Sequence, residues 1–303
     1  MIKTIRRISV VLMASSLVMI SGCTKKSDIK KTTENMETGE GLTQETETNE
    51  NIVGENKRRM TYADESYVFH YMDIDENVEP MQYDLGSFFK EDGLMTYDDD
   101  EYTYRLGVDV SKYQKKVKWS KVEKAGFEFA MIRLGYRGYT EGDIFLDEYY
   151  EENIQNANRS GLDVGVYFFS QALTEDEAIE EAQFVLEHIK GYEIGMPIVY
   201  DPEIVYNDNS RTKGVSKEQF TKNTLAFCNV IKEAGYETMV YANMRWEDEQ
   251  LNMSELEGID IWYADYVGLP QTPYHFEMWQ YTEKGRVDGI DGGTDINIQM
   301  IKK

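Results

Sequence analysis

The sequence is poor in cysteine and histidine, and this scarcity excludes two kinds of site. Only Cys23 and Cys228 occur among 303 residues, too few for a disulfide framework, and no CxxC pair is present to bind a metal. Cys228 stands in the amphipathic run LAFCNVIKEAG, where a cysteine normally packs as a small hydrophobic residue. His70, His188 and His275 are scattered without metal-ligand spacing, so we expect neither a metal nor another cofactor.

Positive charge is also in short supply. The chain carries 32 Lys and Arg against 56 Asp and Glu, a net charge of −24. Residues 1–22 hold three positive and no negative charges, so their removal would take the net charge to −27. This balance excludes nucleic acid as a partner and excludes binding to anionic surfaces by charge. It is compatible with a neutral sugar substrate.

The first 22 residues are not part of the fold. Lys3, Arg6 and Arg7 precede an apolar run and then small residues, a pattern typical of an export signal peptide rather than a spanning helix. The segment ends in ISGC, which resembles a bacterial lipobox and implies cleavage before Cys23 and acylation of its thiol. We therefore expect an extracytoplasmic protein anchored by lipid to the outer face of the cell membrane. The alternative is ordinary secretion after cleavage nearby.

Aromatic residues are absent from residues 24–60, which are rich in Lys, Thr, Glu and Asn. Such a segment cannot bury a core, so residues 23–60 are predicted to form a lipidated, disordered tether. Residues 61–104 then contain ten Tyr or Phe together with many acids. We interpret them as an ordered extension that packs on the main domain, with more linker as the alternative.

Residues 105–303 alternate strand and helix patterns, which predicts an α/β fold with a mostly parallel sheet. Eight short apolar runs are candidate strands: LGVDVS, FEFAMIRLGY, DVGVYFFS, PIVYD, TMVYAN, IDIWYADY, FEMWQYT and TDINIQM. Capping boxes are expected at 120–123, 174–177 and 216–219, and a further helix over 144–161. Helix stops are expected at Gly126, Gly161, Gly191 and Gly235. Residues 266–275 and 282–293 have no helical pattern, so we expect an irregular, parallel-rich barrel whose last strands lack helices.

Acidic residues recur at the predicted carboxyl ends of these strands and at the start of the last run. They are Asp109, Asp201, Glu203, Asp265 and Asp295. In barrels of this kind, groups at the carboxyl ends of strands converge on one mouth. Asp201 and Glu203 are two positions apart in YDPEIV and would face the same side of a strand, while Pro202 ends that strand.

Aromatic residues accompany the acids, and rings beside carboxylates in an open cleft suit sugars. The candidate substrate-binding residues are Tyr167, Arg133, Tyr200, Tyr263, Asp265, Trp279 and Tyr281. For some of them a structural role is the alternative. Arg133 could pair with Asp109 inside the barrel, and Trp279 and Tyr281 could share a face that belongs to the core.

The runs GVDVSKYQ, GVYFFS, IVYDPE, IWYADY, MWQYT and GGTDINIQ occur in an order that resembles glycoside hydrolase family 25, the Chalaropsis-type lysozymes. The resemblance covers residues 105–303 and implies a (β/α)5(β)3 barrel. It also implies cleavage of the β-1,4 bond between N-acetylmuramic acid and N-acetylglucosamine in peptidoglycan. The family's DxE pair falls on Asp201 and Glu203, and its first-strand and last-strand aspartates fall on Asp109 and Asp295. Pro202 departs from the apolar or aromatic residue that is common between the two acids.

This resemblance makes Glu203 the general acid. We expect an ionised Asp201 to disfavour a second negative charge and so to keep Glu203 protonated. The resemblance also allows the 2-acetamido group of the substrate, oriented by Asp201, to act as nucleophile, although a direct role for a second aspartate stays open. Two other functions remain open: a non-catalytic, glycan-binding lipoprotein and a chitinase-like glycosidase. The sequence does not indicate an oligomeric state.

Overall fold

The computed structural model describes residues 58–64 and 66–303. The expected signal peptide, Cys23 and nearly all of the expected tether lie outside these residues. Among the described residues, the first strand, β1, runs from Arg59 to Ala63. No helix within the described ranges is both long and apolar enough to cross a membrane.

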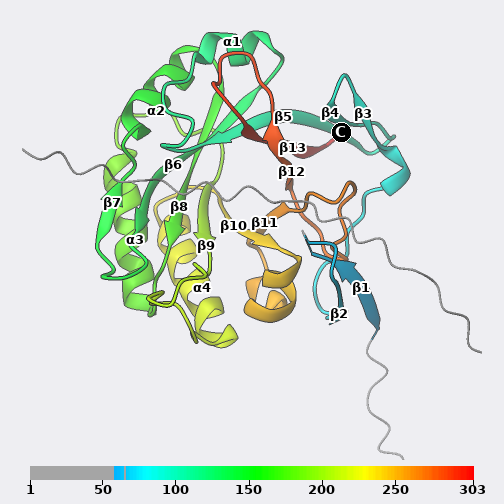
Figure 1. The fold of residues 1–303 in the computed structure, drawn as a ribbon, viewed down its shortest axis with the longest axis vertical. Helices are drawn as coiled ribbons and strands as arrows, with labels where there is room; N and C mark the ends of the chain where they lie inside the picture. Colours follow the sequence, from blue (N-terminus) through cyan, green and yellow to red (C-terminus); the bar gives the residue numbers. More distant parts are fainter. Residues whose placement is uncertain (1–57, 65) are drawn as a thin grey trace, which may run out of the picture. The chain divides into compact units, whose positions relative to one another are not determined.

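Eight strands close into a barrel, and each of them coincides with one of the runs expected from the sequence (Figure 1). They are β5 (Tyr102–Val110), β6 (Phe129–Arg137), β8 (Asp163–Ser170), β9 (Ile198–Pro202), β10 (Thr238–Asn243), β11 (Asp260–Ala264), β12 (Met278–Gly285) and β13 (Thr294–Lys302). Neighbours from β5 round to β12 are parallel, whereas β13 runs antiparallel to both β12 and β5. The expected irregular barrel is confirmed, and its closing strand is reversed.

Four α-helices cover one side of the barrel: α1 (Trp119–Lys124), α2 (Tyr150–Arg159), α3 (Glu175–His188) and α4 (Lys217–Glu233). Helices α2 and α3 pack on β6 and β8, and α4 packs on β9 and β10. Between β10 and β11 the chain forms two short helical turns, η2 (Trp246–Gln250, π-helical) and η3 (Met253–Leu256, 3-10). In the described chain, no helix lies between β11 and β12 or between β12 and β13, as the sequence predicted.

The local helix signals were partly correct. The hydroxyl oxygens of Thr174 and Ser216 each accept a hydrogen bond from the backbone N–H three residues on, at 3.3 Å, which caps α3 and α4. The cap expected at Ser120 is wrong, because α1 begins at Trp119 and its N-cap residue makes no side-chain bond. The helix expected over 144–161 is shorter, because its first residues form β7 (Ile144–Leu146), which pairs with the end of β6.

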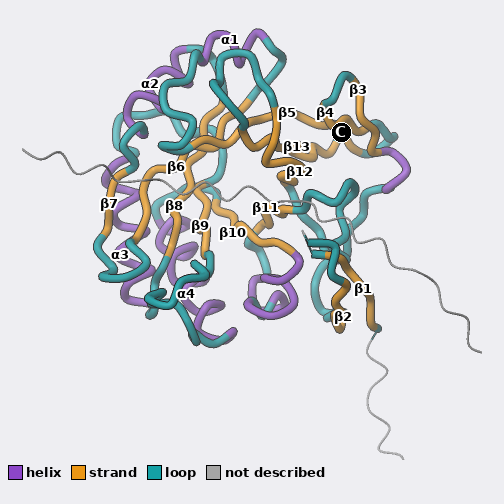
Figure 2. The backbone as a smooth tube through the Cα atoms, viewed as in Figure 1, coloured by secondary structure: helices purple, strands orange, loops and turns teal. Residues whose placement is uncertain are grey.

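The N-terminal extension takes the place of the missing helices. It contains two hairpins, β1 (Arg59–Ala63) with β2 (Phe69–Asp73) and β3 (Phe88–Glu91) with β4 (Leu94–Tyr97), and the short helix η1 (Leu85–Ser87). Figure 2 shows these strands on the side of the barrel opposite the long helices. Residues 79–81 run beside residues 273–275, joined by backbone bonds of 2.9 Å from Met81 to Pro273 and from His275 to Glu79.

Aromatic packing holds the extension on β12 and on the residues just before this strand. The ring of Phe88 meets the ring of Trp279 edge-on at 5.4 Å. The hydroxyl of Tyr83 donates a 2.6 Å hydrogen bond to the carbonyl of Phe276, and the backbone N–H of Met95 donates to the hydroxyl of Tyr281. Burying one such ring contributes roughly 1.5–3 kcal/mol, so several buried rings attach the extension stably to the barrel.

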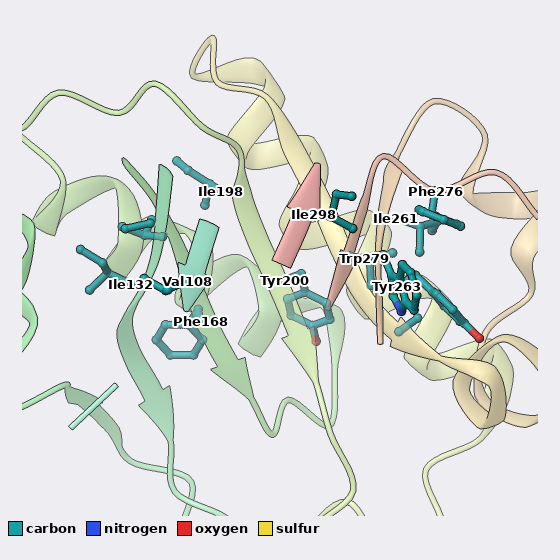
Figure 3. Close-up of a cluster of buried hydrophobic side chains, with 14 of the residues drawn as sticks. Val108, Ile132, Phe168, Ile198, Tyr200, Ile261, Tyr263, Phe276, Trp279 and Ile298 are labelled. Atoms are coloured by element: carbon teal, nitrogen blue, oxygen red, sulfur yellow. The ribbon is translucent and has the colours of Figure 1, made fainter. Parts of the chain in front are cut away.

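The strands carry two separate apolar layers because alternate side chains point to opposite faces. The larger layer lies outside the barrel, and Figure 3 shows part of it, including Ile198, Tyr200, Tyr263 and Trp279. The smaller layer fills the barrel interior. Its members are Phe129, Met131, Met196, Val199, Met239, Trp262 and Met278, with Tyr167 and Tyr241 packed against them.

Candidate active site

A cleft of about 850 Å³ opens at the mouth of the barrel, where the parallel strands have their carboxyl ends. Four acids expected from the sequence line it: Asp109 from β5, Asp201 from β9, Glu203 just beyond β9, and Asp295 from β13. Asp295 is near the beginning of its strand rather than the end. It reaches the same mouth because β13 runs antiparallel to its neighbours.

Asp109 and Asp295 form a carboxyl pair across the β5–β13 ladder. They are register partners, and their side chains hydrogen-bond to each other. The side-chain amides of Gln280 and Asn297 each donate a 2.8 Å hydrogen bond to Oδ2 of Asp109. Burial and the neighbouring Asp109 raise the pKa of Asp295 to about 9. Burial also raises the pKa of Asp109, although its hydrogen bonds with Asn297, Gln280 and Asp295 oppose this. At neutral pH the pair therefore retains a proton.

Asp201 is buried at the end of β9, with an exposed fraction of 4%. Burial, followed by the nearby charge of Glu203, raises its pKa well above the usual range, and Arg133 opposes this. The sequence led us to expect an ionised Asp201, whereas the cost of dehydrating the carboxylate favours its protonated form here. Among the described residues, none donates a hydrogen bond to the buried Oδ1 of Asp201. A buried polar atom without a hydrogen-bond partner lowers the stability of the fold, unless a ligand donates a hydrogen bond to it.

Glu203 follows Pro202 and is half-buried at the cleft wall. Its backbone carbonyl accepts a 2.5 Å hydrogen bond from the side-chain amide of Gln171, which is fully buried. The carbonyl oxygen of the Gln171 side chain in turn accepts from the hydroxyl of Thr212 at 3.2 Å. The loop that follows Glu203 is therefore fastened to the end of β8.

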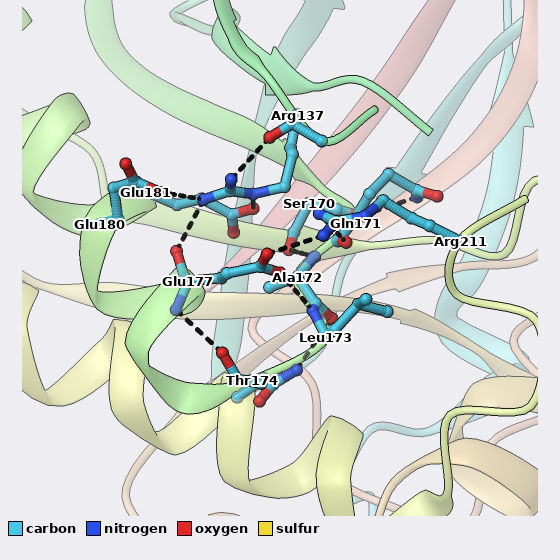
Figure 4. A network of polar contacts seen from close by, with 12 residues as sticks. Arg137, Ser170, Gln171, Ala172, Leu173, Thr174, Glu177, Glu180, Glu181 and Arg211 are labelled. Atoms are coloured by element: carbon cyan, nitrogen blue, oxygen red, sulfur yellow. Dashed lines mark hydrogen bonds and ion pairs between the residues drawn. The ribbon is translucent and has the colours of Figure 1, made fainter. Parts of the chain in front are cut away.

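Figure 4 shows the polar network around Gln171. Arg211 donates to the backbone carbonyl of Gln171 at 3.2 Å and forms a 2.7 Å ion pair with Glu177. Arg137 forms a 2.7 Å ion pair with the fully buried Glu181, whose pKa burial raises to about 7. Sequence reasoning did not identify these residues, because their partners lie on separate elements.

Arg133 lies in the cleft, as expected, but it pairs with Asp147 rather than with Asp109. Its Nε and one terminal nitrogen lie 2.8 and 2.7 Å from Oδ2 of Asp147. The guanidinium also stacks over the rings of Tyr113 and Tyr136, at 5.5 and 5.4 Å from their centroids. Cation and rings together form one aromatic wall of the cleft.

Tyr167 also lines the cleft, with its ring edge-on to that of Trp262 at 5.7 Å. Sequence reasoning missed Trp262, Tyr241 and Tyr266, which line the same cleft. The hydroxyls of Tyr241 and Tyr266 both donate to the side-chain carbonyl of Gln280, at 2.9 and 2.5 Å. Strand alternation could have located Trp262, because Trp262 and Tyr263 must point to opposite faces.

Four aromatic residues expected to contact sugar do not line the cleft, and these expectations are corrected. Tyr200 points outward, and its hydroxyl accepts a 2.8 Å hydrogen bond from the hydroxyl of Ser170. Tyr263, Trp279 and Tyr281 are buried on the outer face of β11 and β12, the last two against the extension. Each is one position away from an inward residue, so alternation sends it to the other face.

Asp265 is also outside the main cleft, and it has a structural role in the turn after β11. Its Oδ2 accepts a 2.8 Å hydrogen bond from the hydroxyl of Tyr263 and two bonds of 3.1 Å from Gln271, and its Oδ1 accepts from the backbone of Val267. These bonds shape the turn after β11. Asp265 does line a second, smaller cavity beside the cleft.

Comparisons with known proteins agree with this architecture. The model of the family described as glycosyl hydrolases family 25 matches residues 108–290. The autolytic lysozyme of Clostridium acetobutylicum is 26% identical over 192 residues, which are 63% of this chain and 54% of that protein. Lysozyme M1 of Streptomyces globisporus is 27% identical over 202 residues, and the match covers 66% of it. The chain thus spans about half to two thirds of these relatives.

Solved structures share the fold. A family 25 glycosyl hydrolase from Bacillus anthracis superposes with a TM-score of 0.55 at 23% identity, covering 69% of this chain and 94% of that one. The modular autolysin LytC from Streptococcus pneumoniae, in complex with a synthetic peptidoglycan ligand, gives 0.59 at 22% identity, covering 78% and 56%. The family match extends over more than half of the sequence and includes β9 with its DxE pair, and these structures share its barrel. The chain therefore belongs to family 25 of the glycosyl hydrolases.

Proposed function

We propose that this protein is a muramidase that cleaves the β-1,4 bond between N-acetylmuramic acid and N-acetylglucosamine in peptidoglycan. The observation that carries the proposal is the convergence of Asp109, Asp201, Glu203 and Asp295 on one open cleft with aromatic walls. Glycosidic cleavage needs a proton donor beside a group that stabilises the developing positive charge of the sugar. The relatives support the choice of substrate, because they include two lysozymes and an autolysin in complex with a synthetic peptidoglycan ligand.

Glu203 is the proposed general acid. It stands at the half-buried rim of the cleft, where the leaving oxygen of a bound glycan can approach it. Its backbone is fixed by Gln171, so the carboxyl group starts from a defined position. General acid catalysis requires this kind of placement within hydrogen-bonding distance of the bond that breaks.

Asp201 is the proposed partner of the substrate's 2-acetamido group. Its buried Oδ1 is an acceptor that the described residues leave without a donor, and the amide N–H of the acetamido group would supply one. That hydrogen bond would favour the ionised form of Asp201, and the proton of the pair would then reside on Glu203. Substrate binding itself would thereby set the protonation state that the reaction requires, with the acetamido oxygen oriented toward the anomeric carbon.

The Asp109–Asp295 pair completes the charge arrangement. Because Asp295 keeps its proton at neutral pH, the cleft carries less negative charge than four ionised acids would give. Asp109, which accepts hydrogen bonds from Gln280 and Asn297, would offer a fixed acceptor near the sugar ring and would stabilise positive charge there when it is ionised.

The site of action follows from residues outside the described chain. A lipid on Cys23 would anchor the enzyme to the outer face of the membrane, with residues 23–60 as the expected tether. Mass spectrometry of the mature N-terminus tests this directly. An unmodified terminus, or a protein released into the medium without a lipid, would contradict the anchor and leave ordinary secretion.

Reducing-end analysis of digested peptidoglycan tests the activity. Borohydride reduction followed by hydrolysis should yield reduced muramic acid. Reduced glucosamine would identify the other glycosidic bond as the one cleaved, as expected for a chitinase-like specificity. No new reducing ends at any pH, from folded protein that still binds the wall, would support a glycan-binding protein instead.

A further inference from the structure

A second cavity, of about 320 Å³, opens beside the main cleft between the β1–β2 hairpin and the barrel loops. The hairpin contributes Tyr62, Ala63 and Asp64, and the barrel contributes Gln271 and Met244 among others. Its volume is at the lower end of the range of about 300–1,000 Å³ that is usual for small-ligand sites. The hairpin precedes residues 108–290, which match the family model, so this pocket is a feature of this chain and not of the family domain alone.

The pocket continues the cleft. Tyr206, Asn243, Arg245 and Tyr266 line both cavities, so a chain molecule lying in the cleft can extend past them into the pocket. We propose that the pocket binds a further N-acetylated sugar ring of the glycan strand, so that the N-terminal extension makes the enzyme prefer long strands. This inference rests on the proposed function and names an additional part of its substrate site.

The hairpin wall is fixed in place. Ala63 and the side chain of Gln271 form a reciprocal pair, with 2.9 Å bonds from the backbone N–H to the amide oxygen and from the amide nitrogen to the backbone carbonyl. Gln271 is bonded in turn to Asp265. The hydroxyl of Tyr62 donates to Asp248 at 3.3 Å. A preformed wall loses little entropy when a ligand binds.

The charged side chains that line the pocket already have partners in the protein. Asp64 accepts from the backbone of Ser66 and Val68 at 2.9 Å and meets Nε2 of His70 at 3.0 Å. Asp265 accepts the bonds described above, and Arg245 forms a 3.0 Å ion pair with Glu249. A ligand therefore need not bring a charge, which favours an uncharged sugar over the charged stem peptide.

Tyr206 offers the apolar surface that a sugar ring requires. Its side chain is 81% exposed at the junction of the two cavities. Its hydroxyl accepts a 3.1 Å hydrogen bond from Arg245, which holds the phenol while the ring face stays open. Rings held in this way stack on the apolar faces of sugars, and the pocket's amides and hydroxyls can meet the sugar's edges.

The test compares peptide-free glycan strands of four and eight sugars as substrates of the full chain. Ala63→Trp fills the pocket while its backbone bonds to Gln271 are kept, and Tyr206→Ala removes the ring without touching the core. Tyr71→Ala is the matched control, because Tyr71 is on the same hairpin, is 72% exposed and does not line the pocket. We expect the ratio of kcat/KM for eight over four sugars to fall roughly two- to tenfold in both pocket variants and to stay unchanged in the control.

Wild-type enzyme without length preference, or pocket variants that keep the preference, would overturn the proposal. A loss seen only with strands that carry stem peptides would overturn it in favour of a peptide site. If the wild type cleaves neither length, the proposed function fails. Calorimetric binding of the same strands then still tests whether the pocket binds a sugar ring. Tighter binding of eight sugars that Ala63→Trp abolishes supports it, and equal binding of both lengths refutes it.

Discussion

The side-chain amide of Gln171 donates a 2.5 Å hydrogen bond to the backbone carbonyl of Glu203, joining the segment after β8 to the segment after β9. Gln171 does not line the cleft, yet it fixes where the chain turns after Pro202. Its amide nitrogen also donates to the carbonyl of Ser170, and its oxygen accepts from Thr212. Both polar atoms of this side chain are therefore hydrogen-bonded, one of them to the Glu203 backbone, and we propose that Gln171 is a positioning residue for Glu203.

Gln171→Met should lower kcat while KM changes little. Methionine has a similar shape and length but cannot donate, so the Glu203 backbone is free to shift, and a displacement of about 1 Å can cost up to ~10²-fold in rate. Kinetics of the folded variant and its pH profile provide the measurement. Gln155→Met, an exposed glutamine on α2, is the control. A loss of thermal stability with kcat and the pH profile unchanged would show that Gln171 is structural only.

Glu203→Gln should leave the fold intact and reduce hydrolysis by about 10²–10⁴-fold, because the amide cannot act as a proton donor. Release of reducing ends from peptidoglycan measures the rate, and circular dichroism checks the fold. The control is Glu187→Gln, an exposed glutamate on α3. More than about a tenth of the wild-type activity in Glu203→Gln would be incompatible with the assigned role.

Phe88→Ala should destabilise the whole domain by about 3–5 kcal/mol, the usual cost of removing a buried phenylalanine ring. Phe88 is 6% exposed and packs on Trp279, whereas the adjacent Phe89 is 49% exposed. Phe89→Ala is thus a control one position away, expected to change stability by less than about 0.5 kcal/mol. Urea unfolding followed by tryptophan fluorescence measures both. An unchanged main transition in Phe88→Ala would mean that the extension folds apart from the barrel.

The pair Asp109–Asp295 predicts how stability depends on pH. The pKa of Asp295 is raised from 3.8 to about 9 in the folded protein, so the folded state holds its proton more tightly than the unfolded state. Its contribution is therefore fully favourable below pH 4 and is lost as pH rises toward 9. Asn cannot ionise and can still donate to Asp109, so Asp295→Asn should flatten this fall.

Thermal unfolding at pH 5, 7 and 9 measures the effect. The wild type should lose more of its Tm between pH 5 and pH 9 than Asp295→Asn does. Asp291→Asn, an exposed acid in the preceding turn, should behave like the wild type. Parallel pH curves for the wild type and Asp295→Asn would show that Asp295 does not hold a proton in the folded state.

The strands and the acidic mouth could be predicted from the sequence because both depend on local patterns. Each strand is a short apolar run between turn residues, and Asp109 and Asp201 end two such runs. The aromatic residues could not be assigned as simply. Tyr200 lies between Val199 and Asp201, which both point inward, so Tyr200 must point outward. If alternation had been applied strictly to β11, Trp262 rather than Tyr263 would have been predicted to line the cleft.

What covers the outer face of β12 could not be predicted by any local rule. Trp279 and Tyr281 are on a face that a helix would cover in the first half of the barrel. The sequence suggested sugar contact for them because aromatic residues accompany the acids at the expected mouth. The face is covered instead by Phe88 and Met95, nearly 200 residues away. Sequence patterns indicate that a face is buried, but the partner depends on a long-range pairing that a single sequence does not contain.

The last prediction concerns Asp201 itself. Its Oδ1 is buried and has no donor among the described residues, and its charge state is tied to that of Glu203. In the substrate complex, where we propose that Asp201 is ionised, Asp201→Asn removes one negative charge beside Glu203. Glu203 should then lose its proton at lower pH, and the alkaline limb of the activity profile should move to lower pH. The substitution also removes the carboxylate that would receive the acetamido N–H, so the maximum rate should fall. The limb reports apparent values for the coupled pair rather than for either residue.

Rates measured against pH on soluble peptidoglycan fragments decide the matter. Asp208→Asn is the control, since Asp208 is an exposed acid on the loop that follows Glu203, and its removal should leave both the limb and the rate nearly unchanged. A bystander aspartate would bond turn amides, and its loss would alter stability more than kinetics. Asp201 Oδ1 makes no such bond to the described residues, so we expect the kinetics to change. An unshifted alkaline limb together with a near-normal rate would rule out the paired-acid mechanism and leave YDPE as a strand end.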